Sequence, residues 1–146
     1  MEEPSYLIVP LLQGFFWFDE GLQNYLRRRG WSEITRPQSM VMVSVITGTT
    51  RPADIARQLG ISRQAIHVTI NQMVAMDLLE LRDDPKDQRS KIVGISRTGE
   101  RRRNDARQAV RMLTEELSRR IGARNVRNLL TAFAKDWGEP IAFDDK

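Results

Sequence analysis

The most constraining feature of the sequence is a pair of short helical patterns joined by a glycine turn near the middle of the chain. The apolar spacing predicts one helix over residues 52–59, which Gly60 ends, and a second helix that Ser62 caps and that reaches about Met76. The apolar side of the second helix falls within an arc of about 60°, formed by Ile66, Ile70 and Met73. Two short helices connected in this way are the signature of a helix-turn-helix.

The other face of the second helix is unusual in its charge. No acidic residue occurs anywhere between positions 55 and 76. The members of this face are Gln64, His67, Val68, Asn71 and Ala75, with Arg63 and Gln72 at its edges. A solvated helix face normally mixes both signs of charge, so this pattern indicates a surface kept free for an anion.

A charged β-hairpin is expected next along the chain. Residues 78–82 and 91–96 carry apolar side chains on either side of a polar, proline-containing segment, residues 83–90. This pattern predicts two strands joined by a long charged tip. A hairpin directly after a helix-turn-helix is a wing, so the two features together predict a winged helix-turn-helix.

A long apolar helix is predicted before this lobe, from about Ser5 or Pro10 to Arg29. Its seam has alternating steps of three and four residues, at Ile8, Leu11, Phe15, Phe18, Leu22 and Tyr25. It is either an ordinary core helix or a helix shared between the core and a dimer partner. We favour the second interpretation, because this much aromatic surface on a terminal helix would otherwise be exposed.

Capping signals predict the remaining helices. Thr35 begins a capping box, which favours a helix to about Thr47, although the β-branched residues of this segment would equally suit a strand. Ser96 caps a long helix that Gly122 interrupts, and a final helix carries apolar residues as far as Trp137.

We therefore predict a mainly α (α+β) fold in a single domain, residues 1–146, a length that suits one domain. Residues 35–96 are expected to form a winged helix-turn-helix lobe that binds DNA. Residues 1–34 and 97–137 are expected to form dimerisation helices, and residues 138–146 a loose acidic tail.

Three motifs carry a resemblance to a known family. They are residues 50–62 (TRPADIARQLGIS), 84–91 (DPKDQRSK) and 95–99 (ISRTG). Through them the chain resembles the MarR (multiple antibiotic resistance regulator) family of bacterial transcription factors, and the order of expected elements agrees over most of its length. The wing motif followed by this helix start is much more specific than a helix-turn-helix alone. Gly94 within the second strand and Ser96, where Thr is commoner, depart from the family pattern.

The charge balance favours an anionic partner. The chain has 23 basic and 19 acidic residues, a net charge of +4, and the whole excess lies between Arg51 and Arg103. Only four of the basic residues are Lys, and the planar guanidinium of arginine suits phosphates and base edges. Double-stranded DNA is therefore the favoured partner.

The composition also excludes several classes of protein. Without cysteine there are no disulfides, thiolate metal sites or thiol nucleophiles, and a single histidine leaves little for zinc binding or a catalytic triad. We expect no enzyme activity, metal or cofactor. The longest apolar stretch, residues 7–18, is well short of the ~20 residues of a membrane-spanning helix, so we expect a cytoplasmic protein without a membrane partner.

The recognition helix, residues 62–76, is expected to read DNA in the major groove. Its first turn would present free amides to phosphate. The carboxamides of Gln64 and Asn71 suit adenine, the guanidinium of Arg63 suits guanine or phosphate, and the methyls of Val68 suit thymine. The expected contacts come from Ser62, Arg63, Gln64, His67, Val68 and Asn71. For His67 the alternative is a surface histidine with no role. We favour a groove contact because His67 shares the arc of Gln64 and Asn71.

In the wing, residues 83–91, the resemblance implies that Arg89 inserts into the minor groove. Asp87 can pair with Arg89 and hold its guanidinium in one orientation, and a narrow groove supplies the negative potential that attracts it. Lys86 and Lys91 are the expected phosphate partners.

These expectations combine into a sequence-specific regulator, a dimeric repressor that binds an inverted-repeat operator. The alternative is an architectural protein that binds DNA without sequence preference. The resemblance also implies a small aromatic effector in a crevice between the dimerisation helices and the DNA-binding lobe, which Phe16, Trp17, Trp31 and Met40 could line. The simpler interpretation, which we favour, is that all four are core residues.

Overall fold

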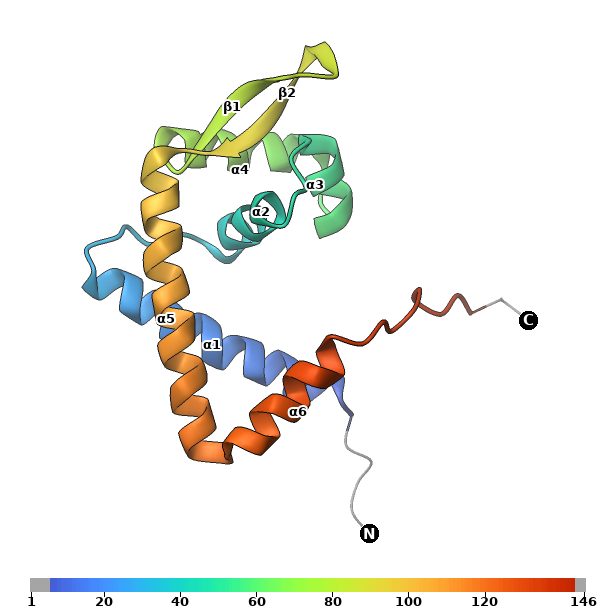
Figure 1. Cartoon of the computed structure of the whole chain (residues 1–146). Coiled ribbons are helices and arrows are strands. Elements are labelled where there is room, and N and C mark those ends of the chain that lie inside the picture. Colours follow the sequence, from blue (N-terminus) through green and yellow to red (C-terminus); the bar gives the residue numbers. More distant parts are fainter. Residues whose placement is uncertain (1–5, 144–146) are drawn as a thin grey trace.

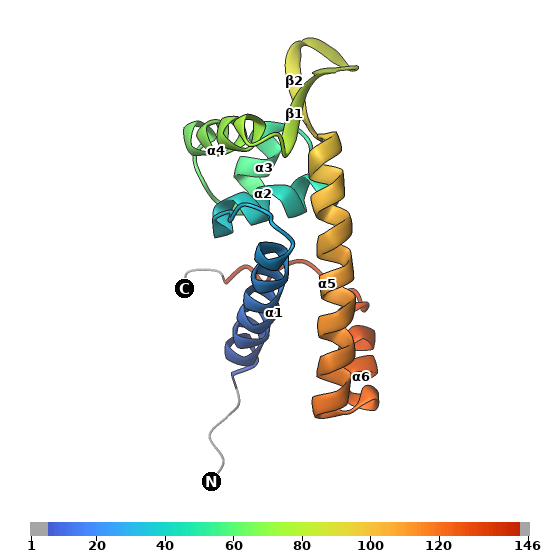
Figure 2. The same ribbon diagram turned by 90° about the vertical axis from the view of Figure 1, so that its left-hand side faces the viewer.

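The chain forms two lobes connected by one long helix. The computed structural model describes residues 6–143. A winged lobe (residues 35–96) lies at one end, and helix α5 runs from it to a helical lobe in which α1 and α6 flank the far part of α5 (Figure 1; Figure 2). The elements follow in the order α1 (Ile8–Arg28), α2 (Arg36–Ile46), α3 (Pro52–Leu59), α4 (Arg63–Ala75), β1 (Leu79–Asp84), β2 (Asp87–Ile95), α5 (Arg97–Ile121) and α6 (Ala123–Phe133).

The polar caps predicted from the sequence are confirmed. At the start of α2, the Thr35 hydroxyl accepts a hydrogen bond from the Gln38 amide at 3.3 Å, and the Gln38 side chain accepts one from the Thr35 amide at 2.9 Å. The Ser62 and Ser96 hydroxyls cap α4 and α5, and Gly60 ends α3 in the left-handed region with φ of 66°. The segment with β-branched residues is thus a helix, because its first-turn donors are satisfied by the box.

The wing differs from the prediction at its tip. Strands β1 and β2 pair antiparallel, beginning with Leu79 opposite Ile95 and ending, after a bulge, with Asp84 opposite Asp87. The strands therefore extend through most of residues 83–90, which we expected to be a loop, and the turn is only two residues long. Both faces of this part of the hairpin are largely exposed. Pairing there needs no apolar alternation, and a charged composition does not reveal it.

The core of the winged lobe lies where α2, α3, α4 and the base of the wing meet. The predicted buried stripe of α4 is confirmed, since Ile66, Ile70 and Met73 are at most 1% exposed. These side chains belong to one apolar cluster with Val41, Val45, Ile55, Leu79 and Val93. The cluster determines which face of α4 is turned outward.

Helix α1 lies against α5 and leaves a wide apolar surface open. A Cβ placed on Gly21 would lie 2.5 Å from Cδ2 of Leu113, so the two helices are closely packed, yet Leu26 is the one buried residue of α1. The exposed apolar side chains of α1, its N-cap and α6 include Leu7, Ile8, Leu12, Phe15, Phe16, Leu129, Leu130 and Phe133. Of the predicted seam, Ile8 and Phe15 are exposed in a single chain and the other four residues are half-buried, which leaves apolar surface for the shared helix that we favour.

The ends of the helical lobe differ slightly from the prediction. Helix α1 begins at Ile8, and Ser5 lies outside the described residues. Helix α6 ends at Phe133, before Trp137, whose indole N–H donates to the carbonyl of Ala132 at 3.0 Å and so satisfies part of the last turn. Residues 138–143 of the expected tail contain no helix or strand, and residues 144–146 lie outside the described part.

The first turn of α5 is locked onto the winged lobe. Asp77, which follows the C-cap of α4, has a φ of 56°. Its carbonyl accepts from the Ser96 hydroxyl at 2.5 Å, and its carboxylate accepts from the Thr98 hydroxyl at 2.6 Å. Gly99 approaches Leu78 so closely that a Cβ would lie 2.1 Å from the carbonyl oxygen. These contacts join α5 and the winged lobe into one packed unit.

Candidate nucleic-acid interface

The exposed face of α4 is the face predicted to read DNA. Arg63, Gln64, His67, Val68 and Asn71 are all exposed, while the buried stripe on the opposite side holds the helix in this orientation. Within residues 6–143, these polar side chains make no hydrogen bond to another part of the chain, whereas Oε1 of Gln72, at the edge of the face, accepts from Nε2 of Gln38 on α2 at 3.3 Å. The side chains that could meet base edges are therefore available for external partners.

Ser62 is the N-cap residue of α4. Its hydroxyl accepts a hydrogen bond from the amide of Ala65 at 3.0 Å. The amides of Arg63 and Gln64, in the same turn, have no partner within a helix. The predicted phosphate contact at this end is therefore better suited to the backbone than to the Ser62 hydroxyl.

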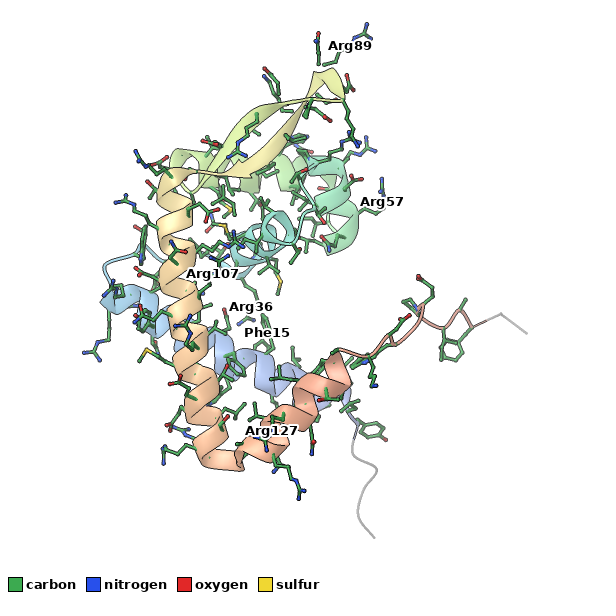
Figure 3. The ribbon with its side chains drawn as sticks, in the orientation of Figure 1. Phe15, Arg36, Arg57, Arg89, Arg107 and Arg127 are labelled. Carbon is green, nitrogen blue, oxygen red and sulfur yellow. The ribbon has the colours of Figure 1, made fainter. Side chains whose placement is uncertain are left out.

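Arg89 lies at the tip of the wing and projects away from the rest of the molecule (Figure 3). The predicted pairing of its guanidinium with Asp87 is wrong. Asp87 accepts from the backbone amide of Arg89 at 3.0 Å and from the hydroxyl of Ser90 at 2.9 Å. Aspartate side chains commonly bond the amide two residues on, so this carboxylate shapes the turn. Arg89 has no ion pair with any residue that the structure describes.

The two lysines of the wing differ in their freedom. Lys91 pairs with Asp83 on the neighbouring strand. Lys86 is exposed in the turn and, among residues 6–143, has no acidic partner. Of the two predicted phosphate contacts, Lys86 is therefore the one whose ammonium group is not already in an ion pair with a described residue.

A groove of about 400 Å³ lies between α4, the start of α3 and the wing. Its lining includes His67 and Asn71 from α4 and Ser90 and Lys91 from the wing, so the fold brings the two predicted DNA-contact segments together. Arg51 also lines the groove, and sequence reasoning missed it. Its place in the Thr-Arg-Pro start of the helix-turn-helix motif is the sequence signal that could have identified it.

An ion pair joins Arg51 to the wing. Its Nε and Nη2 donate to Oδ2 of Asp84 at 3.1 and 2.9 Å, while Oδ1 accepts from the amide of Lys86 at 2.9 Å. The Asp84 side chain is only 3% exposed. The Lys86 amide, together with the hydrogen bond and charge of Arg51, lowers the pKa of Asp84, which keeps this sheltered carboxylate ionised.

Comparison with known proteins identifies the lobe that carries this groove. A sequence profile of the MarR family matches residues 32–90. The match covers most of the winged helix-turn-helix, from before α2 to the first half of β2. No protein of curated function matches the sequence significantly.

The chain as a whole shares its fold with solved structures from several bacteria. RV1404 from Mycobacterium tuberculosis is 19% identical, with a TM-score of 0.72 over 95% of this chain and 98% of that one. Apo wild-type MarR from E. coli is 21% identical, with a TM-score of 0.67 over 91% and 96%. The transcriptional regulator Tm0710 from Thermotoga maritima is 19% identical, with a TM-score of 0.66 over 89% and 90%. These matches confirm the predicted fold class.

The profile match over residues 32–90 supports a DNA-binding transcriptional regulator. Between residues 6 and 143, no three histidine or acidic side chains gather in a way that could hold a metal ion. None of the described helices combines the length and the apolar character needed to cross a membrane.

The four residues predicted to line an effector crevice lie in different surroundings. Phe16 is exposed on α1, whereas Trp17 on α1 and Met40 on α2 are half-buried. The indole N–H of Trp31 donates to the carboxylate of Asp105 on α5 at 2.7 Å. About three helical turns separate Trp17 from the end of α1 near Trp31. The four residues therefore do not gather around one cavity, and none belongs to the buried core.

The junction of the two lobes instead holds a buried charge, Arg102 of α5. Its side chain is 5% exposed, and its Nε and Nη2 have no hydrogen-bond partner among the described residues. Burial lowers the pKa of Arg102. Arg102 lines a cavity of about 210 Å³ with Trp31 and a second of about 100 Å³ with Leu22. Sequence reasoning missed this residue, although it lies four positions before Ala106 on the predicted seam of α5.

Proposed function

We propose that this protein is a sequence-specific transcriptional regulator that binds an inverted-repeat operator as a homodimer. The groove between α4 and the wing carries the proposal, because side chains suited to base edges and side chains suited to phosphates line it together. Its place in a MarR-family lobe supports the same function. Such a regulator would act in the bacterial cytoplasm.

Each DNA contact has a separate task in this proposal. On α4, Gln64 and Asn71 offer paired donors and acceptors to adenine, and the methyls of Val68 meet thymine. The narrow minor groove attracts the Arg89 guanidinium. Arg63 contacts guanine or phosphate, and His67 lies in the major groove. The phosphates are bound by the amides after Ser62 and by Lys86 and Lys91. Asp87 makes no DNA contact and shapes the turn of the wing.

The exposed apolar surfaces of α1 and α6 support dimerisation, since contiguous surfaces of this kind are uncommon on monomers. We assign residues 1–34 and 97–137 to the dimer interface. Two-fold symmetry then places the two α4 helices about one DNA turn apart, about 34 Å, which requires an inverted-repeat operator. A monomeric mass by light scattering at micromolar concentration would contradict this assignment.

Selection of DNA from a random pool tests the function directly. The full chain should enrich an inverted repeat that it binds at least about 10³-fold more tightly than unrelated DNA at the same salt concentration. Enrichment of no sequence, together with tight binding to every duplex, would favour the alternative of an architectural DNA-binding protein.

We also propose that the regulator is a repressor and that a small aromatic acid releases it. The guanidinium of Arg102 supports an anionic ligand, because a buried charge without partners costs free energy that a carboxylate would offset. A ligand acts on DNA binding only if it prefers one arrangement of the lobes. Repression is tested with a reporter whose promoter overlaps the selected operator, and activation of that reporter would contradict it.

Thermal-shift measurements with a panel of aromatic acids test the effector. A binding acid should raise the unfolding temperature of the wild-type chain. Arg102→Met should be more stable than wild type without ligand and should lose the response, because the variant removes both the cost of burial and the anion partner. Arg101→Met, at the exposed neighbouring position, is the matched control and should keep the response. Failure of every acid to shift wild type would argue against this effector class.

A further inference from the structure

We propose that the ion pair between Arg51 and Asp84 fixes the tip of the wing relative to the recognition helix, so that both are held as one unit before DNA is bound. The proposal rests on the proposed function, because it names what sets the geometry of the same DNA-binding surface. Arg51 and Asp84 act as positioning residues, through Arg89 at the tip.

Arg51 belongs to the rigid part of the winged lobe. It is the N-cap residue of α3, and α3 enters the core through Ile55, which is fully buried. The carbonyl of the preceding residue, Thr50, accepts from the amide of Val93 at 2.8 Å and ties the same loop to β2. The backbone position of Arg51 is therefore set by the same core that orients α4.

Asp84 is the last buried residue before the tip of the wing. Leu79 and Val93, each 1% exposed, anchor the base of the hairpin in the core, whereas every side chain from position 85 to 89 is exposed. A two-stranded hairpin is marginally stable by itself, so the tip depends on ties to the lobe. One oxygen of Asp84 closes the turn and the other receives two donors of the Arg51 guanidinium. A planar guanidinium restricts direction in a way that a point charge does not.

Loss of the ion pair should leave the base of the wing in place and free its tip. Arg89 would then have to be ordered at the moment of DNA binding. Ordering one backbone residue weakens an equilibrium by about tenfold. The expected effect is therefore about a tenfold loss of operator affinity, with little change in the stability of the fold.

The test compares Asp84→Asn with Asp83→Asn, a neighbouring position that is exposed and changes charge in the same way. The probe is the duplex that wild type selects from a random pool. Each variant makes the chain more positive, which by itself favours DNA. We expect Asp84→Asn to bind about tenfold more weakly and Asp83→Asn to bind at least as tightly as wild type. If Arg51 served DNA only as a phosphate contact, Asp84→Asn would free its guanidinium and strengthen binding, which would overturn the proposal.

A double-mutant cycle identifies the path of the effect. In an Arg89→Ala background, Asp84→Asn should cause no further loss, because the tip no longer carries the side chain that it positions. Hydroxyl-radical protection of the minor groove should disappear in the single variant Asp84→Asn, while methylation protection in the major groove remains. Additive losses of affinity would overturn the proposal.

The pair can also be broken from its other side if Asp84→Asn unfolds. Arg51→Gln is compared with Arg57→Gln, an exposed position on α3 with the same change of charge. Equal binding by these two variants would overturn the proposal. A tenfold weaker binding by Arg51→Gln that disappears in the Arg89→Ala background would support it, whereas a loss that persists there would make Arg51 a phosphate contact and overturn it. A wild-type chain that selects no sequence from the pool would instead refute the proposed function, so the two failures are distinguishable.

Discussion

Replacement of Gly99 by alanine tests whether α5 is locked to the winged lobe at its first turn. A Cβ at this position would lie 2.1 Å from the carbonyl oxygen of Leu78 and 2.8 Å from Cγ2 of Ile95. The nearest atom belongs to the backbone, so rotation of a side chain cannot relieve the clash. Either α5 or the start of β1 has to shift.

Two effects of this substitution oppose each other. Overpacking of a well-packed site costs about 1 to 3 kcal/mol, and a clash with backbone belongs at the upper end, about 3 kcal/mol. Alanine is the better helix former by about 1 kcal/mol. The free energy of unfolding should therefore fall by about 2 kcal/mol, which for a chain of this size lowers the unfolding temperature by about 4 to 8 °C.

Urea titration and calorimetry at one fixed protein concentration measure this difference, since the stability of a dimer depends on concentration. Gly14→Ala is the matched control, because Gly14 lies in α1 and, among residues 6–143, no atom beyond its chain neighbours and the adjacent backbone of α1 lies within 4 Å of the added Cβ. Helix propensity alone then predicts no loss. A Gly99→Ala variant that is as stable as wild type would refute the locked joint.

Three further predictions concern DNA binding and acid stability. Arg89→Ala should weaken operator binding by about 10- to 100-fold and reduce the salt slope by about one, measured by anisotropy at several salt concentrations; a monomeric or unfolded variant would show that the wing serves the fold instead. Asn71→Ala should cost about 1 to 3 kcal/mol, concentrated at particular base pairs in a panel of operator variants, and uniform weakening would make Asn71 a backbone contact. Hydrogen bonds from Arg119 and Arg120 lower the pKa of Glu116 from 4.5 to about 2. Because this pKa is lower in the folded state, the stabilisation is present above about pH 4.5 and is lost as the pH falls toward about 2. Glu116→Gln should therefore flatten the acid side of the stability curve, and a curve identical to that of wild type would contradict the assignment.

The features predicted correctly from the sequence depend on local chemistry. Ser62 and Ser96 indicate where their helices begin, because a capping hydroxyl and the amide that donates to it are three residues apart. Ile66 and Ile70 identify the buried stripe because the helical period is local. The hairpin tip could not be located in the same way. An exposed ladder is stabilised by backbone pairing, which leaves no apolar pattern in the residues that form it.

The members of the candidate interface could be predicted, but their contacts could not. His67 and Asn71 follow from the helical period alone. The pairing of Arg51 with Asp84 joins positions 33 residues apart and depends on how α3 packs beside the wing. For Arg102 the position on the seam of α5 follows from the helical period. Its burial could not be predicted, because a charged side chain suggests a solvated residue.

The joint at Gly99 also constrains how a ligand at Arg102 would act on DNA binding. Arg102 lies within one helical turn of Gly99, on the same helix. An anion that binds the guanidinium of Arg102 would change how α5 packs against α1. Because the first turn of α5 is locked to the winged lobe through Asp77 and Leu78, α4 would turn together with α5. The distance between the two recognition helices of a dimer would then change while each winged lobe kept its internal structure. Hydrogen exchange should accordingly slow in α1 and α5 on ligand binding and stay unchanged in the core of the winged lobe, whereas a general slowing in α3 and α4 would show that the ligand acts by ordering the lobe itself.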